Sequence, residues 1–393
     1  MRILLLIDDM HPKSGGPPRV VSGMAAALAA RGDRVEILAL CHPSDNNDVI
    51  SSWPELTKLG VPMRLFPFTG PAVMGRSRTL TAYVRQNVGE FDLLHVHCVW
   101  HQVLAGASGI FRRASRPYVV SAHGELGRQQ MRKSAVKKFV ARKLFGVDEM
   151  LSKASSVIFA TDSESDEIGS SLPITRRDII PNGVTVPLRD SNNQLNAAKI
   201  RSRFPQSERW NRTFLFFGRL YPTKGLDLLI EAFASVSRDF RGAGLVAAAI
   251  SQDLELESLL HTRISELGTD SIVLTTDFVG SSAQAMFDIA DVFVLPSHHE
   301  GFSMATLEAA ASGLPVLITD KCHMPEFGTF GAGLVVADTA SGLEAGLRDF
   351  LRLSDADIER MGKAAATVVA EYYSWDRVAD LLSKLYRSLS GHQ

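Results

Sequence analysis

Residues 2–40 decide the fold class. The stretch opens with the apolar run RILLLI (2–7), passes through the turn-forming SGGPP (14–18), continues as VVSGMAAALAARG (20–32) and returns to an apolar run in VEILAL (35–40). Short apolar runs are typical of buried strands, and the apolar spacing between them is typical of a helix that ends at a glycine. A strand, a helix and a second strand in this order predict a parallel sheet covered by helices.

The same alternation runs through the rest of the chain and restarts once. Residues 183–212 are polar and contain Asn and Pro, which predicts a linker. A new strand at 213 opens a second series, and SWDRVADLLSKLYRSLS (374–390) is an amphipathic helix. We predict an α/β protein with an N-terminal domain over 1–182, a linker over 183–212, a second domain over 213–372 and a terminal helix over 373–393.

The composition is that of an ordinary globular protein. Of 393 residues, 45% are apolar and 22% are charged, and 42 basic residues nearly balance 43 acidic ones. The three cysteines, Cys41, Cys98 and Cys322, are far apart, which argues against a disulfide framework or a cysteine-based metal cluster. No apolar run has the length of a signal peptide or a membrane span, so the sequence predicts a cytoplasmic protein.

Positive charge is concentrated in the N-terminal half. Residues 1–150 carry 20 basic and 12 acidic residues, whereas residues 151–393 carry 22 and 31. Ten basic residues lie between Arg112 and Lys143, where Glu125 is the one acid. This asymmetry predicts that the N-terminal half faces an anionic ligand or surface; the alternative is a solvated helix face. No nucleic-acid reader motif accompanies the charge, so nucleic acid is not an expected partner.

Polar residues that directly follow strands are the candidates for function, because ligands of parallel sheets bind beyond the carboxyl ends of the strands. Gly15 and Gly16 follow the first strand, where glycines allow the backbone to approach a ligand beside a helix N-terminus. Arg219 and Lys224 follow the strand FLFFG (214–218) on a loop, and two such cations can neutralise a diphosphate. The alternative for the two glycines is an ordinary tight turn, and the alternative for Arg219 and Lys224 is a pair of surface cations without a ligand.

SHHEGFSMATLE (297–308) is the most informative stretch. Glu300 is expected in the loop after a strand, and Glu308 about two turns further on in the following helix. Carboxylates accept from hydroxyls and the unpaired amides of a helix N-terminus donate to oxygens, which fits a polyhydroxy ligand. Stabilisation of the helix dipole is the alternative for Glu300. The amides concerned belong to Gly301, Phe302, Ser303 and Met304.

Five segments together resemble the retaining glycosyltransferases of family 4. The pattern EGF-x5-EA-x2-SG-x-PV from Glu300 resembles their E-x7-E signature, and GRL-x3-KG from Gly218 is similar to their diphosphate motif. SGGPPRVV (14–21), IIPNGV (179–184) and ADVFVLPS (290–297) fit as well. The resemblance covers essentially the whole chain. It implies the GT-B fold, in which two Rossmann-like, doubly wound parallel-sheet domains face a central cleft.

The resemblance implies a role for each matching residue on the donor side. Arg219 and Lys224 would hold the donor diphosphate. Glu300 and the amides of residues 301–304 would hold the donor sugar, and Glu308 would bind the ribose hydroxyls. The backbone of Gly15 and Gly16 would approach the diphosphate or the sugar from the N-terminal domain.

A second set of residues is implied for the N-terminal domain. His123, in SAHGE (121–125), matches the family's histidine after a strand and would lie beside the transferring sugar; an ordinary loop histidine is the alternative. With Arg219, Lys224 and Glu300 it would form the catalytic set. Four further residues follow strands and are expected on the acceptor side: Asp9, His97, Trp100 and His101.

The implied reaction transfers a hexosyl group from a nucleoside-diphosphate sugar to an acceptor hydroxyl, with retention of configuration. No Asp-x-Asp motif is placed to hold a metal, so we expect no metal and no cofactor, with Arg219 and Lys224 neutralising the leaving diphosphate. Residues 128–145 resemble a surface-lying helix that contacts anionic lipid. Relatives with such a helix build bacterial exopolysaccharides on polyprenyl diphosphate, which implies a lipid-linked glycan acceptor and peripheral attachment to the inner face of the plasma membrane.

Three other functions stay open at this point: transfer to a soluble acceptor, a GT-B sugar-nucleotide epimerase, and an inactive sugar-nucleotide-binding protein. Two loops also depart from the family pattern near the expected nucleobase pocket, at 251–253 and at 277–280. The choice between a UDP and a GDP sugar is therefore left open.

Overall fold

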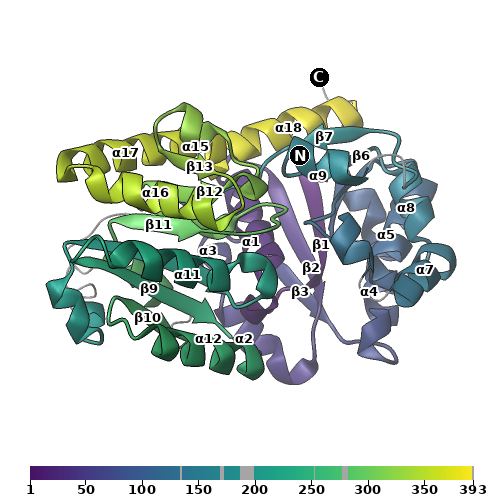
Figure 1. Ribbon diagram of the computed structural model, residues 1–393. Coiled ribbons are helices and arrows are strands. Elements are labelled where there is room, and N and C mark those ends of the chain that lie inside the picture. The colour runs from purple at the N-terminus through teal and green to yellow at the C-terminus, as the bar shows by residue number, and fades with distance from the viewer. Residues whose placement is uncertain (133–134, 169–171, 186–198, 252, 277–281, 392–393) are drawn as a thin grey trace. The chain divides into compact units, whose positions relative to one another are not determined.

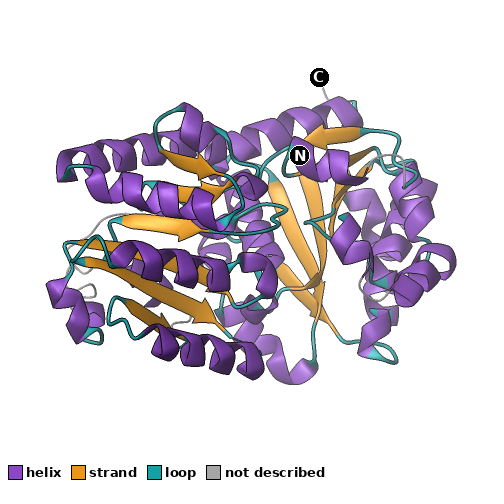
Figure 2. Ribbon diagram, viewed as in Figure 1, coloured by secondary structure: helices purple, strands orange, loops and turns teal. Residues whose placement is uncertain are grey.

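The computed structural model describes residues 1–132, 135–168, 172–185, 199–251, 253–276 and 282–391. Its contacts divide the chain into two compact units: unit 1 contains Met1–Gly183 and Trp375–Gln393, and unit 2 contains Val184–Ser374. Within each unit, helices cover a sheet of strands (Figure 1, Figure 2). The α/β class predicted from the sequence is therefore confirmed.

Unit 1 is built on seven parallel strands in the order β3-β2-β1-β4-β5-β6-β7. The interior strand β1 pairs with β2 and β4, and Ile3 to Ile7 are fully buried, as expected for a strand covered on both faces. The strands are β1 Arg2–Asp9, β2 Arg34–Leu40, β3 Met63–Phe66, β4 Leu93–His97, β5 Tyr118–Ser121, β6 Ser156–Phe159 and β7 Arg177–Ile179. The helices are α1 Gly16–Ala30, α2 Asn46–Ser51, α3 Pro54–Lys58, α4 Arg78–Asn87, α5 Gln102–Arg113, α6 Arg128–Arg132, α7 Ala135–Leu144, α8 Val147–Lys153, α9 Asp162–Ile168 and α18 Trp375–Ser390.

Unit 2 is built on six parallel strands in the order β10-β9-β8-β11-β12-β13. Its core extends to Ile200 and Phe204, so residues 199–211 pack with this unit although the sequence analysis assigned them to a linker. The strands are β8 Arg212–Arg219, β9 Ala243–Ile250, β10 Ile272–Thr275, β11 Val292–Leu295, β12 Val316–Thr319 and β13 Gly333–Val336. The helices are α11 Leu226–Ser237, α12 Leu254–Leu267, α13 Ser282–Phe287, α14 Met304–Ala311, α15 Glu326–Thr329, α16 Ala340–Arg352 and α17 Asp355–Val368, and a π-helical turn spans Val369–Tyr373.

The C-terminal helix α18 is part of unit 1. It packs against α1, and its side chains Val378, Leu382 and Tyr386 are buried at the spacing of one helix face. Segments from the two ends of the chain therefore share one core, and the hydroxyl of Tyr386 reaches the side chain of His95 on β4, 2.6 Å away.

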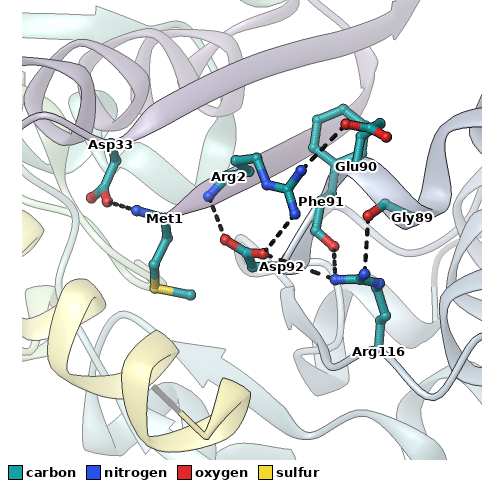
Figure 3. A network of polar contacts seen from close by, with 8 residues as sticks. All are labelled: Met1, Arg2, Asp33, Gly89, Glu90, Phe91, Asp92 and Arg116. Carbon is teal, nitrogen blue, oxygen red and sulfur yellow. Dashed lines mark hydrogen bonds and ion pairs between the residues drawn. The ribbon is translucent and has the colours of Figure 1, made fainter. Parts of the chain in front are cut away.

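A network of charged residues holds the amino ends of the strands in unit 1 (Figure 3). The ammonium group of Met1 lies 2.6 Å from Asp33, which precedes β2. Asp92, which precedes β4, accepts a hydrogen bond from the backbone amide of Arg2 at 2.8 Å and lies 3.3 Å from its guanidinium. Arg116, which precedes β5, lies 3.9 Å from the same carboxylate. The carboxyl ends of these strands carry the polar residues considered next.

The basic segment of unit 1 forms two helices, α6 and α7, on either side of residues 133–134, which lie outside the described residues. Residues 128–145 were predicted to form one surface-lying helix. Among residues 138–144 of α7, whose side chains are described, Ala141 is buried, whereas Phe139 is 62% exposed and Leu144 is 74% exposed. None of the described helices is both long and apolar enough to cross a bilayer.

Some of the basic residues of this segment form ion pairs with acidic residues. Arg142 and Lys143 lie 2.6 Å and 3.1 Å from the carboxylate of Asp148. Arg112 lies 2.7 Å from Glu149. Both acids lie on α8, which follows Lys143 in the sequence, and they pair with basic residues of the segment 112–143. The number of basic residues in that segment therefore overstates the positive charge of this surface.

Candidate active site

The turn after β1 is shaped by Asp9. Its carboxylate accepts a hydrogen bond from the amide of His11 at 2.8 Å and another from the hydroxyl of Ser14. Gly15 has a φ of 98°, which a side chain would strain, and Gly16 begins α1 with open space where a Cβ would stand. The turn therefore offers accessible backbone at a helix N-terminus, as predicted, while Asp9 shapes the turn.

Beside this turn, an acid–base cluster lies at the carboxyl ends of β1, β4 and β5. The Nδ1 atom of His101 is 2.9 Å from the carboxylate of Asp8. Burial would lower the pKa of His101, but the contact with Asp8 outweighs it and raises that pKa. Glu125 accepts a hydrogen bond from the amide of Val99 at 2.8 Å, and burial together with the charge of Asp8 raises the pKa of Glu125 to about 7. Asp8 and Glu125 had no predicted role in the sequence analysis.

Replacing Glu125 with Gln is expected to stabilise the protein at high pH. A carboxyl with a folded-state pKa of about 7, against the usual 4.5, costs stability as the pH rises from 4.5 to 7, because the folded site resists ionisation. The cost at pH 8 is at most about 3 kcal/mol. We expect Glu125→Gln to unfold at a higher denaturant concentration than the wild type at pH 8, and this gain to disappear towards pH 4.5. An equal gain at both pH values would mean that packing, and not ionisation, is responsible.

His97 and His123 are brought together at the ends of β4 and β5. His97 Nδ1 is 2.9 Å from His123 Nε2, and the two rings are nearly parallel, with centroids 5.2 Å apart. His97 is fully buried, whereas His123 is partly exposed. His97 was predicted on the acceptor side; it is fully buried, and its ring stacks against that of His123.

A strained turn presents His123. Its φ is 50°, in the left-handed region that few residues other than glycine adopt, and Gly124 follows at 77°. Glu164 holds this turn: its buried carboxylate accepts from the amide of Gly124 at 2.7 Å and from that of Ala160 at 2.9 Å. Backbone strain that a buried carboxylate maintains is typical of functional sites.

Trp100, another predicted acceptor-side residue, lies on the segment between β4 and α5. The ammonium of Lys138 is 5.0 Å from the centroid of its ring, a cation–π contact. Within the described residues, the buried indole Nε1 of Trp100 has no hydrogen-bond partner. An indole N–H of this kind is available to an acceptor atom of a ligand.

In unit 2, the predicted cation pair lies at the carboxyl end of β8. Arg219 is the last residue of the strand, and not part of a loop as the sequence analysis had it; its exposed guanidinium lies 5.3 Å from the centroid of the Tyr221 ring. Lys224 ends a 3-10 turn over Pro222–Lys224. In the part of the chain that the structure describes, Arg219 makes no ion pair. It is therefore available to an anion.

Lys224 and Glu300, both predicted site residues, form an ion pair. Glu300 is 8% exposed, and its Oε1 also accepts a hydrogen bond from the hydroxyl of Ser297 at 2.7 Å. The loops that carry the pair are tied by a hydrogen bond from the amide of His298 to the carbonyl of Thr223, at 2.9 Å. The structure thus joins the cation of one predicted motif to the carboxylate of another.

Gly225 permits this approach. Its φ is 66°, and a Cβ on it would stand 2.2 Å from the carbonyl oxygen of Pro296, at the end of β11. A side chain at Gly225 would therefore push the loop that carries Lys224 away from the loop that carries Glu300.

Helix α14 begins beside this ion pair. The hydroxyl of Ser303 caps it by accepting from the amide of Thr306 at 3.2 Å. Glu308 is partly buried one turn further along the same helix. Within the described ranges, the backbone amides that were predicted to donate to a ligand donate to no protein group: those of Gly301, Phe302, Ser303 and Met304.

The two loops that depart from the family pattern are described only in part. Asp253 caps α12 by accepting from the amide of Leu256 at 3.0 Å. Gln252 and residues 277–281 lie outside the described residues.

Two parallel-sheet units with polar residues at the carboxyl ends of their strands fit the GT-B fold, and comparisons with known proteins assign the class. The model of the "glycosyl transferases group 1" family matches residues 200–368, and that of the "glycosyl transferase 4-like domain" matches residues 15–183. The chain belongs to the group 1 glycosyltransferases, as the sequence motifs indicated.

Similar proteins agree with this assignment. A D-inositol 3-phosphate glycosyltransferase of Arthrobacter sp. is 30% identical, over 95% of this chain and 90% of its own length. A GDP-mannose:cellobiosyl-diphosphopolyprenol alpha-mannosyltransferase of Xanthomonas oryzae is 26% identical, over 96% of this chain and 94% of its own length. The solved structure of Anabaena HepE in complex with UDP has a TM-score of 0.74 at 18% identity, over 99% of this chain and 100% of that chain, and supports the fold.

Proposed function

We propose that the protein transfers a hexosyl group from a nucleoside-diphosphate sugar to an acceptor hydroxyl, with retention of the anomeric configuration. The observation that carries the donor assignment is the cluster of Lys224, Glu300 and the unpaired amides 301–304 in unit 2. A cation, a carboxylate and N–H donors are the groups that a diphosphate and a sugar ring require. Retention is supported by the family motifs. An NMR spectrum of the product, which reports its anomeric configuration, tests it.

Neutralisation of the leaving diphosphate is assigned to side chains. Arg219 offers a planar fork of donors and Lys224 a point charge, while the N-terminus of α14 adds a partial positive charge. We therefore propose that transfer needs no divalent cation. His123, on unit 1, would contact the transferring sugar, as the family resemblance implies.

The test of this donor site is a thermal-shift panel of nucleoside diphosphates and their sugars, with and without Mg²⁺ or EDTA. A ligand at 100 times its Kd adds about 2.7 kcal/mol of stability. Selective stabilisation by one base, unchanged by EDTA, is the expected result and would choose between UDP and GDP. Hydrolysis or epimerisation of the donor without transfer to any acceptor would favour the epimerase. Failure of all nucleotides to bind would contradict the donor site.

Glu308→Gln is expected to weaken binding of the nucleoside diphosphate by about 1–3 kcal/mol, if the carboxylate accepts from ribose hydroxyls. This corresponds to a Kd raised about 5- to 150-fold in isothermal titration calorimetry. Glu359→Gln is the matched control, because that side chain is 68% exposed on α17. Equal affinities of the wild type and Glu308→Gln would contradict the ribose assignment.

For the acceptor, we propose a lipid-linked glycan used in the synthesis of a bacterial surface polysaccharide. The support is the relative from Xanthomonas oryzae, whose name specifies a diphosphopolyprenol acceptor and whose similarity extends over 96% of this chain. A transferase for such an acceptor works beside a membrane, so we further propose peripheral association through residues 128–145.

Two features of unit 1 support a lipid-facing surface there. The apolar side chains of Phe139 and Leu144 are largely exposed on α7. A pocket of about 250 Å³ between α5 and the segment from α7 to α8 is lined by Leu144 and by Arg112 and Arg113. Exposed apolar residues next to arginines fit the boundary between acyl chains and anionic headgroups.

Leu144→Asp is expected to reduce the fraction of protein that floats with vesicles containing anionic lipid, by at least fivefold. The change removes apolar surface and adds a charge that the headgroups repel. Leu254→Asp is the matched control, because that leucine is 80% exposed on α12 of unit 2. Equal flotation of both variants, or a wild-type protein that stays in the soluble fraction at low salt, would contradict the membrane proposal and favour a soluble acceptor.

A further inference from the structure

A column of three histidines runs through the core of unit 1. His95 Nδ1 is 2.6 Å from the hydroxyl of Tyr386 on α18, and its Nε2 is 2.8 Å from the hydroxyl of Ser121 on β5. The ring of His95 stacks on that of His97, with centroids 4.1 Å apart. His97 in turn meets His123, Nδ1 to Nε2, at 2.9 Å. Two fully buried histidines thus stand behind the partly exposed His123.

Both members of the last pair are neutral near pH 7. Burial lowers the pKa of His123 to about 4 and lowers the pKa of His97 well below its usual range. A neutral imidazole carries one N–H group and one bare nitrogen. Since the two nitrogens at 2.9 Å share a single proton, either His97 donates to His123 or the reverse.

The other nitrogen of His97 decides between these arrangements. Among the described residues, Nε2 of His97 has no hydrogen-bond partner, and it is buried. If His97 carried its proton there, an N–H group would be buried without an acceptor, which costs about 1–3 kcal/mol. A buried donor without a partner is also rarer in proteins than an acceptor without one. The favoured arrangement therefore has the proton of His97 on Nδ1.

We infer that His97 is a positioning residue that fixes the tautomer of His123: His97 Nδ1–H donates to His123 Nε2, so that His123 keeps its own proton on Nδ1. The paired nitrogens of His95 hold the ring of His95 in one orientation, and the stacking holds His97.

The consequence for the reaction rests on the proposed function. With its Nε2 occupied, His123 can meet a substrate oxygen only as a hydrogen-bond donor, through Nδ1. It cannot take the proton of the acceptor hydroxyl, because neither nitrogen is a free base. That proton then goes to another group, and the departing phosphate oxygen is the base that a front-face transfer supplies.

The test is a long-range ¹H–¹⁵N spectrum of the full chain labelled with ¹⁵N in its histidine rings, at pH 7.5. The signals of His123 are identified by their loss in His123→Asn. We expect the protonated nitrogen of His123 to be Nδ1. A wild-type spectrum with the proton on Nε2 overturns the inference. This reading needs no substrate, so it stands or falls independently of the proposed function.

Two variants of His97 test its role. His97→Phe keeps a ring but removes the donor, and we expect the Nδ1–H form of His123 to fall below half and kcat for transfer to fall about tenfold. His97→Asn places an amide N–H where Nδ1 stood, and we expect it to retain the Nδ1–H form and a kcat within about threefold of the wild type. Variants that lower Tm but leave the tautomer of His123 unchanged would show a purely structural role and overturn the inference. If His97→Phe does not fold, the tautomer of His123 in the wild type and in His97→Asn still tests the inference.

Discussion

Lys224→Ala is expected to lower kcat/KM for transfer by about 10²–10³-fold, the usual loss when one donor to a developing negative charge is removed. In unit 2 the ammonium of Lys224 is already held in place by Glu300, whose side chain is 8% exposed. A cation with a fixed position stabilises the leaving diphosphate without reorganising at the moment of reaction. Steady-state kinetics with the nucleotide sugar found in the thermal-shift panel would measure the loss.

The same substitution has a structural effect that needs its own control. Lys224→Ala leaves the carboxylate of Glu300 with only the hydroxyl of Ser297 among the partners described. An unpaired buried charge is costly, so Tm should fall. We expect the double variant Lys224→Ala/Glu300→Gln to recover Tm. Its activity should stay low because it lacks two donor-site residues, so the loss due to Lys224 is measured on Lys224→Ala well below its Tm. Lys363→Ala, on an exposed side chain of α17, should change neither. Activity that recovers together with Tm would show that Lys224 acts through stability alone.

The order of elements could be predicted because most strands are short, largely apolar runs, as expected for parallel sheets. The run RILLLI became β1 with Ile3 to Ile7 fully buried, and FLFFG became part of β8. The polar character of residues 199–211 hid their packing: Ile200 and Phe204 are isolated apolar residues in a segment rich in polar ones, yet both enter the core of unit 2.

Some residues of the candidate site could be predicted from the sequence and others could not. Arg219, Lys224 and Glu300 belong to motifs whose spacing is visible along the chain, so their roles could be inferred before the structure. Asp8 and Glu125 are single acids after strands, and a single acid there is indistinguishable from a turn or cap residue. The available signal was their position at the ends of neighbouring strands, β1 and β5, with β4 between them.

Charge could be counted from the sequence but not placed. Asp148 lies outside the basic stretch that ends at Lys143, yet it contacts both Arg142 and Lys143. The burial of His97 was hidden for a similar reason. LLHVH (93–97) predicts a strand, but the groups that meet its histidines come from other parts of the chain: His123 follows β5, and Tyr386 lies on α18.

Tyr386→Ala is expected to lower the free energy of unfolding of unit 1 by about 3–5 kcal/mol, the range for truncating a large buried aromatic side chain. Tyr386 is fully buried between α18 and the sheet, and its hydroxyl meets His95 Nδ1. Tyr386→Phe keeps the ring and removes only that partner, so we expect a smaller loss of about 1–2 kcal/mol. The difference between the two variants separates the packing of α18 from its hydrogen bond to the histidine column.

Guanidinium unfolding followed by tryptophan fluorescence can report this for unit 1 alone. Three of the four tryptophans, Trp53, Trp100 and Trp375, lie in unit 1, so a Trp210→Phe background removes the signal of unit 2. Leu59→Ala, on a side chain of unit 1 that is 46% exposed, is the control and should change the midpoint little. If Tyr386→Ala were as mild as this control, α18 would contribute little to the core of unit 1. A large loss confined to the unit 1 transition would instead show that the last helix stabilises the sheet that carries His97 and His123.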